Sequence, residues 1–165
     1  MRILIYILFP FLIIPLTDDG TKKCVIKPSV GVDDIVIDSS YLKDVVEDFT
    51  KSKIEKRWVK AVETELFGRY ERFVNVPNVA KFSSLSRNKK ISKIVFQSPC
   101  NCKTKEGVGI GSSYNKTLSV FGKPRFAYIN QEGNEHRIQL IYNNMYIKFD
   151  GNDTIKSVIY QIKIF

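Results

Sequence analysis

Apolar residues along this chain recur with two different periods. Side chains three or four positions apart share one stripe of a helix, whereas alternate side chains share one face of a strand. Two segments have the helical spacing and end on a phenylalanine: Leu42, Val45, Val46 and Phe49, then Tyr114, Leu118 and Phe121. Segments with the strand spacing follow each of them. The pattern therefore predicts a helix followed by strands in each half of the chain.

The second of these helices has signals at both ends. Ser113 precedes its first apolar residue, where a hydroxyl can accept a free backbone N–H. Gly122 follows its last apolar residue and can take the left-handed C-cap conformation, and Pro124 prevents the helix from continuing.

The first half differs after Phe49, where no glycine ends the helix. Ser52 and Glu55 have the spacing of a capping box, which can start a second helix. Four apolar residues would then share one face: Ile54, Trp58, Ala61 and Val62. This spacing predicts an inserted helix over residues 52–67.

The remaining segments alternate with period two and are separated by turn residues. The expected strands cover residues 69–76, 79–83, 91–97, 125–130, 136–142, 145–149 and 155–165. Between the last two, Asp150-Gly151-Asn152 is typical of a hairpin turn, because Asp-Gly accepts positive φ angles.

Three blocks of sequence recur in the same order in the two halves. Ser39-Ser40-Tyr41 matches Ser112-Ser113-Tyr114, Lys81-Phe82 matches Lys148-Phe149, and the segment 88–97 matches 152–161 with Ile91 over Ile155. We therefore expect an α+β fold of two tandem α-β-β-β units, residues 24–97 and 108–165, joined by a linker over 98–107. Their strands would form one antiparallel sheet with the helices packed on one face.

The N-terminus is typical of an exported protein. Arg2 is followed by an apolar run over residues 3–16 and then by Asp18 and Asp19. The run is shorter than the roughly 20 residues that a membrane span needs, so residues 1–20 are expected to be a signal peptide. The alternative is an uncleaved anchor, which would associate the chain with a membrane. Either reading places the protein in the periplasm or cell envelope, or outside the cell.

The three cysteines fit an oxidising compartment. We expect a disulfide between Cys24 and either Cys100 or Cys102, which leaves one thiol over. The alternative is a thiol or redox enzyme that uses Cys100 and Cys102. A metal site is not expected, because a C-x-C pair and the single histidine, His136, supply too few ligands.

The chain carries a net charge of +9 at pH 7. Such a charge attracts acidic proteins, anionic lipid or polymer, or nucleic acid. Between residues 51 and 65 the basic residues alternate with glutamates, which favours a solvated surface over a groove for phosphates. A protein partner is therefore expected rather than nucleic acid, and the positive charge favours an acidic one. A basic surface for anionic envelope polymer or lipid is the minor alternative.

Catalytic or cofactor motifs are weak in this sequence. His136 with Ser112 or Ser113 could suggest a hydrolase triad, but no G-x-S-x-G elbow occurs and Ser113 is explained as a helix cap. The glycines at 107, 109 and 111 lack the remaining residues of a phosphate-binding loop. We expect no enzyme activity, no cofactor and no metal.

The second half resembles a tandem-repeat family that includes the beta-lactamase inhibitor protein and the SmpA/OmlA outer-membrane assembly lipoproteins. The resemblance covers residues 107–165 and rests on Ile110-Gly111, Ser113, Gly122-Lys123-Pro124, the Phe149-Asp150-Gly151-Asn152 turn and the strand from Ile155 to Val158. It implies an exported, non-enzymatic scaffold of inhibitor, immunity or envelope-assembly type, which binds other proteins through its sheet face and loops.

The strand parity also predicts which side chains face such a partner. Core positions would be Leu140, Ile147, Phe149 and Tyr160, which leaves the other face of the sheet to Gln139, Tyr146, Lys148, Gln161 and Lys163. A tyrosine offers a large contact area at small entropic cost, and lysines steer an acidic partner. We therefore expect Tyr146 to be an anchor, with Lys148 and Lys163 guiding association.

Overall fold

The computed structural model describes residues 24–49, 53–59, 69–85, 89–132, 135–151 and 156–165. The protein is mostly β, with two short helices, α1 (Leu42–Asp48) and α2 (Tyr114–Phe121), and two antiparallel sheets. The smaller sheet has three strands in the order β1 (Ile26–Lys27), β2 (Gly31–Val32) and β3 (Ile35–Val36). These short strands near Cys24 were not foreseen from the sequence.

The larger sheet has eight strands in the order β4-β5-β6-β7-β11-β10-β9-β8. The first half supplies β4 (Ile54–Val59), β5 (Arg69–Val76), β6 (Ala80–Ser84) and β7 (Lys93–Gln97). The second half supplies β8 (Phe126–Glu132), β9 (Glu135–Tyr142), β10 (Met145–Asp150) and β11 (Val158–Ile164). The expected antiparallel sheet with strands from both halves is confirmed, and the three short strands form a second sheet that was not expected. Each half has four strands after its helix, one more than in the expected α-β-β-β unit, and in the first half the additional strand is β4.

The extra strand replaces the inserted helix expected over residues 52–67. Residues 54–59 form β4, which pairs with β5. Ile54 lies opposite Val74 at one end of this pair, and Val59 lies opposite Arg69 at the other. Residues 60–68 lie outside the described part. The helix prediction was wrong here for a simple reason. Ile54 and Trp58 are four positions apart, and a spacing of four fits the helical period and also twice the strand period.

The helix ends follow local sequence signals. The Ser113 hydroxyl accepts the backbone N–H of Lys116 at 3.3 Å, and Gly122 ends α2 with φ of 70°. Ser113 therefore caps α2 as predicted. Gly122 ends the helix with a positive φ, but its ψ of −158° lies outside the left-handed helical region that was expected. In α1 the backbone N–H of Tyr41 donates to Asp44 Oδ2 at 2.6 Å, so an acidic residue in the first turn caps this helix.

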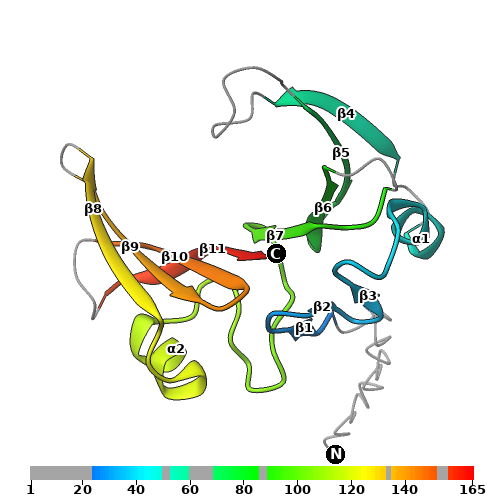
Figure 1. Ribbon diagram of the computed structural model, residues 1–165. Helices are drawn as coiled ribbons and strands as arrows, with labels where there is room; N and C mark the ends of the chain where they lie inside the picture. The colour runs from blue at the N-terminus through cyan, green and yellow to red at the C-terminus, as the bar shows by residue number, and fades with distance from the viewer. Residues whose placement is uncertain (1–23, 50–52, 60–68, 86–88, 133–134, 152–155) are drawn as a thin grey trace, which may run out of the picture.

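Both helices pack on one face of the large sheet (Figure 1). Phe49, next to the end of α1, contacts Phe82, with ring centroids 6.5 Å apart, and Tyr114 at the start of α2 contacts Phe149, with centroids 5.4 Å apart. Strand register places Phe82 and Phe149 on the same face, because directly paired residues point the same way. Phe82 pairs with Ile94, Ile94 pairs with Ile164, and Ile164 pairs with Met145. Met145 lies on the same strand as Phe149, four residues before it, and therefore on the same face.

The core follows the expected positions on the strands, with one exception. Leu140, Ile147 and Phe149 are fully buried, whereas Tyr160 is half-buried. Lys148 pairs with Gln161 but Phe149 pairs with Ile159, so the ladder skips Tyr160 at a β-bulge. The sequence parity could not reveal this bulge, and the assignment of Tyr160 to the core was wrong.

The apolar residues of the two helices are buried to different extents. Val45 is fully buried, but Phe49, Leu118 and Phe121 are only partly buried against the core. Thr117 is the buried residue of α2, and its hydroxyl donates to the Ser113 carbonyl at 2.9 Å. A short helix lying on a curved sheet thus leaves part of its apolar stripe at the edge of the contact.

Equivalent backbone hydrogen bonds join each helix to the last strand of its half. In the first half the N–H of Asp38 donates to the carbonyl of Ile91, the N–H of Ile91 donates to the carbonyl of Ser40, and the N–H of Leu42 donates to the carbonyl of Lys89. In the second half the N–H of Gly111 donates to the carbonyl of Ile159, the N–H of Ile159 donates to the carbonyl of Ser112, and the N–H of Tyr114 donates to the carbonyl of Ser157. Ile91 therefore matches Ile159 and not Ile155, and Leu42 matches Tyr114. Relative to the sequence match, the register of these hydrogen bonds is shifted by four residues in the last strand and by one in the helix.

The two halves meet at an antiparallel pair of equivalent strands, β7 and β11. Val95 lies four residues after Ile91, and Lys163 lies four residues after Ile159. These two residues pair directly. A local two-fold axis therefore passes between Val95 and Lys163, at the centre of the large sheet.

Candidate functional site: the open face of the large sheet

We call the face of the large sheet that points away from α1 and α2 the open face. Figure 1 shows the sheet bending so that its outer strands, β4 and β8, rise on this side. The five residues expected there share this face, because Tyr146 pairs with Lys163 while Lys148 pairs with both Gln161 and Gln139. They lie on three adjacent strands of the second half.

Tyr146 is half-buried on the open face. Its ring packs against Phe165, with the centroids 4.8 Å apart. The last residue of the chain therefore covers part of the tyrosine that was expected to stand exposed. The two rings together form an aromatic surface beside Lys163.

Lys148 and Lys163 lie diagonally across the β10–β11 pair. Within the part of the chain that the structure describes, neither forms an ion pair. Partial burial lowers the pKa of Lys163, and the like charges of Lys148 and Lys93 lower it further. This pair of cations can bind an anionic group, which the described residues do not supply.

The first half contributes residues to the open face that the sequence did not point to. Val95 pairs with Lys163, and Gln97 pairs with Gln161 and accepts a hydrogen bond from its amide nitrogen at 3.3 Å. Lys93 Nζ lies 2.8 Å from Glu71 Oε1, so its charge is compensated. These neighbours were missed because nothing in the sequence indicates that β7 and β11 pair.

The open face continues across the first half as a shallow hollow of about 400 Å³. Lys81 Nζ lies 3.8 Å from the centre of the Phe73 ring there. The lining is mostly polar: Lys53, Glu55, Phe73, Asn75, Pro77, Lys81 and Gln97. This half of the face carries both charge signs, in contrast to the lysine pair at the centre.

A second aromatic pair lies at the outer end of the second half. Phe126 pairs with Ile141 and Tyr128 with Gln139, so both are on the open face. Their rings are stacked with centroids 6.2 Å apart, and both side chains are about half exposed. The Arg125 guanidinium lies 5.4 Å from the Phe126 ring. The strand parity of residues 125–130 could have revealed this pair.

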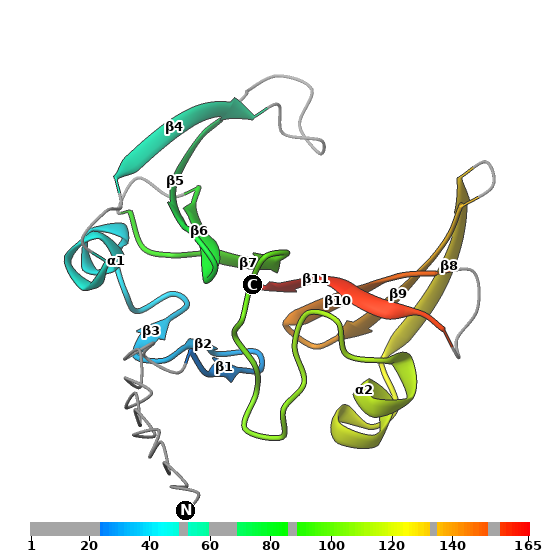
Figure 2. The same cartoon turned by 180° about the vertical axis from the view of Figure 1, so that it is seen from behind.

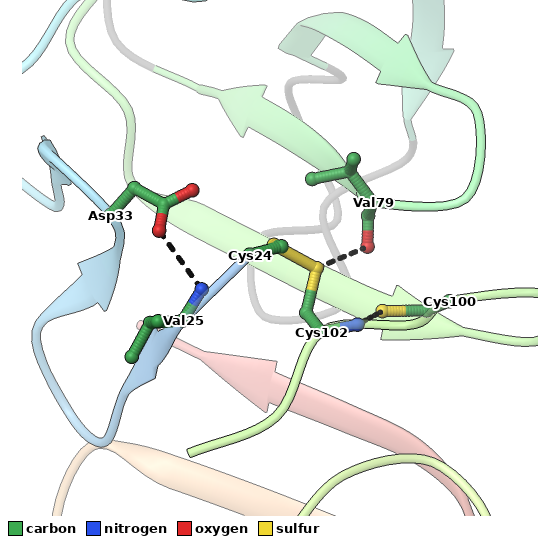
Figure 3. The surroundings of a disulfide bond; sticks show 6 residues. All are labelled: Cys24, Val25, Asp33, Val79, Cys100 and Cys102. Carbon is green, nitrogen blue, oxygen red and sulfur yellow. Dashed lines mark hydrogen bonds between the residues drawn. A yellow bond between two sulfur atoms is a disulfide. The ribbon is translucent and has the colours of Figure 1, made fainter. Parts of the chain in front are cut away.

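The sulfur chemistry centres on the segment between the two halves (Figure 3). Cys24 and Cys102 form a disulfide, so the expected bridge is confirmed and its second partner is Cys102. The same segments are joined by backbone hydrogen bonds, from Ile26 N–H to the Lys103 carbonyl and from Lys103 N–H to the Cys24 carbonyl. A structural disulfide indicates an oxidising, extracytoplasmic environment.

Cys100 is a free, buried cysteine beside this bridge. Its sulfur accepts the backbone N–H of Cys102 at 3.3 Å, and burial raises the pKa of its thiol above the usual value. A redox pair would need Cys100 and Cys102 to bond to each other and would need a readily formed thiolate. The structure instead commits Cys102 to Cys24.

The residues considered for catalysis have other bonding partners or lie outside the described side chains. Ser112 Oγ accepts the N–H of Gly109 at 3.0 Å, and Ser113 caps α2. His136 belongs to β9, but its side chain is outside the described part. The described residues contain no group of three His, Cys, Asp or Glu side chains that could hold a metal ion. They also contain no helix long and apolar enough to cross a membrane.

Comparison of the chain with protein-family models, with curated proteins and with solved structures finds no match.

Proposed function

We propose that this protein is an exported, non-enzymatic binding module whose open sheet face docks an acidic protein. One observation carries the proposal: Lys148 and Lys163 lie together at the centre of this face, next to Tyr146, without an acidic side chain of the described chain to compensate them. Holding two like charges together is unfavourable, so a partner carboxylate would relieve the repulsion and add affinity.

The aromatic group gives such a partner an apolar contact. Tyr146 and Phe165 offer a large and partly exposed surface beside the lysines. Interface hot spots commonly combine an aromatic anchor with surrounding polar groups, and Gln139 and Gln161 supply hydrogen-bonding groups on the same face.

Further support comes from the repeated helix-and-sheet arrangement. We infer that the two halves are tandem copies of one unit and that the chain is related to the family of the beta-lactamase inhibitor protein and the SmpA/OmlA lipoproteins. Residues 1–20 would export it to the periplasm or cell envelope. The disulfide supports this location, and the buried Cys100 argues against the thiol–redox alternative.

The test compares matched variants in capture from an envelope extract, followed by affinity measurement on the captured protein. Tyr146→Ala should weaken binding by about 2 kcal/mol or more, and Lys148→Ala with Lys163→Ala should slow association, while the fold persists. Lys105→Ala with Lys123→Ala removes the same charge from exposed positions elsewhere and is the control.

If the Tyr146 variant and the double variant at Lys148 and Lys163 bind as the unchanged protein does, the open face is not the docking site. A basic surface that binds anionic polymer or lipid would behave differently. Both double variants would then lose affinity equally, and added salt would abolish binding.

A further inference from the structure

The two outer strands of the large sheet, β4 and β8, occupy equivalent positions in the two halves (Figure 2). Register can be followed outward from the central axis on each side. In the first half, Ile54 pairs with Val74, Val74 pairs with Phe82, and Phe82 pairs with Ile94. In the second half, Ala127 pairs with Leu140, Leu140 pairs with Ile147, and Ile147 pairs with Ile162. Since Ile94 and Ile162 are equivalent, Ile54 corresponds to Ala127. Two residues further on, Lys56 corresponds to Ile129.

The two edges differ in chemistry. An outer strand presents unpaired backbone N–H and C=O groups, and proteins commonly protect such an edge with charged residues. β4 carries three consecutive charged residues, Glu55, Lys56 and Arg57. β8 has none from Phe126 to Gln131. Within the described part of the chain β8 pairs only with β9, so its outer edge is both free and unprotected.

Ile129 is the most prominent side chain on this edge. It is 69 % exposed, more than any other large hydrophobic residue in the described part of the chain. It is also the middle residue of the seven-residue strand β8. Burial of an exposed isoleucine at the centre of a free strand edge favours pairing with another strand.

The charges at the ends of β8 indicate which strand fits. Arg125 directly precedes the strand, and Glu132 is its last residue. A second β8 in antiparallel orientation brings the glutamate end of one strand to the arginine end of the other. Parallel pairing would place like charges together, which is unfavourable.

We propose that two copies of this chain associate through antiparallel pairing of β8 with β8, with Ile129 on the two-fold axis. Ile129 then faces the Ile129 of the second copy, Tyr128 faces Asn130, and Phe126 faces Glu132. The same surface is used by both copies, as closed two-fold dimers require. The two eight-stranded sheets become one continuous sheet.

This association has a distinctive salt dependence. Each chain carries a net charge of +9, so two copies repel each other at low ionic strength. Added salt screens the repulsion and leaves the apolar and backbone contacts intact, so it should strengthen the dimer. Docking of an acidic protein would instead weaken with salt. The dimer also uses none of Tyr146, Lys148 and Lys163, so it stands or falls independently of the function proposed above.

Sedimentation equilibrium of the oxidised full chain tests the proposal over a concentration series that reaches about 0.5 mM. The unchanged chain should dimerise, more tightly at high salt. Ile129→Lys gives β8 the residue that β4 has at the equivalent position, and it should raise the dissociation constant by about tenfold or more. Ile54→Lys, an exposed isoleucine on the opposite edge, is the matched control and should change nothing. A monomer at all concentrations, or equal effects of the two variants, would overturn the proposal.

Cross-linking tests the position of the axis. Residues directly opposite each other on antiparallel strands are close enough for a disulfide. Ile129→Cys should therefore give a covalent dimer on mild oxidation, whereas Ala127→Cys should not, because Gln131 of the second copy lies opposite it. A stronger cross-link for Ala127→Cys than for Ile129→Cys would contradict the proposed pairing.

Discussion

Lys163 faces Val95 across the central strand pair, at the point where the two halves of the sheet meet. The two residues occupy equivalent places in the two halves, yet only one of them is charged. Two lysines directly opposite each other would be destabilising. The centre of the open face therefore carries a single cation on the local axis, with Lys148 and Lys93 nearby.

This environment predicts how Lys163 titrates. Burial is the main cause that lowers its pKa, and the charge of Lys148 adds to it. Lys148→Met should therefore raise the pKa of Lys163 partway toward its ordinary value, as measured by NMR titration of the lysine side chains. Lys105→Met, which removes an exposed charge elsewhere, should leave it unchanged. Equal values in all three proteins would show that the two lysines do not interact.

The same shift predicts a dependence of stability on pH. The folded state disfavours the charged form of Lys163, and this penalty is fully present below the lowered folded pKa. It disappears as the pH rises from that value toward the unfolded value of about 10.4. In denaturant unfolding, the unchanged protein should thus gain stability relative to Lys163→Met over this alkaline window. A constant difference would argue against a lowered pKa.

The ion pair between Lys93 and Glu71 should contribute strongly to stability. The Glu71 side chain is almost completely buried, and the 2.8 Å contact joins β7 to β5 across β6. Lys93→Met removes a cation from the buried carboxylate of Glu71 and should lower the free energy of unfolding by about 3 kcal/mol.

The exposed pair of Lys53 and Glu55 provides the control for this prediction. Lys53→Met should lower the free energy of unfolding by less than about 1 kcal/mol, because solvent screens this pair. Similar effects of the two substitutions in urea unfolding would mean that Glu71 is stabilised by other contacts.

The cysteines should behave very differently from one another. The disulfide joins positions 78 residues apart, and Cys24→Ser should reduce stability by about 4 kcal/mol through the entropy of the unfolded chain. Thiol titration should find one free thiol in the oxidised protein. Because burial raises the pKa of Cys100, it should react slowly in the folded state and rapidly after unfolding. Rapid labelling of the folded protein would contradict the burial of this thiol.

The two phenylalanines of the second half should differ in their contribution to the core. Phe149 is fully buried, so Phe149→Ala should lower the free energy of unfolding by about 3–5 kcal/mol. Phe121 is only partly buried and contacts Tyr142 at its edge, so Phe121→Ala should have a smaller effect. An equal loss for the two variants would show that α2 packs more tightly than the structure indicates.

Local sequence signals were enough to predict much of the local structure. Ser113 and Gly122 mark the ends of α2 because capping depends on backbone groups a few residues away. Alternation placed Gln139, Tyr146 and Lys148 on one face because successive strand residues point in opposite directions. It also gave the apolar positions of the core on β9 and β10, and it limited Cys24 to two bonding partners.

Features that depend on which segments meet could be learned only from the three-dimensional fold. Residues 54–59 are a strand because β5 lies beside them, although their spacing also fits a helix. The bulge at Tyr160 and the match of Ile91 with Ile159 arise from hydrogen bonds to distant strands. The pairing of Val95 with Lys163 brings together residues from opposite halves. Such contacts depend on the register between strands far apart in the chain, and local periodicity carries no information about it.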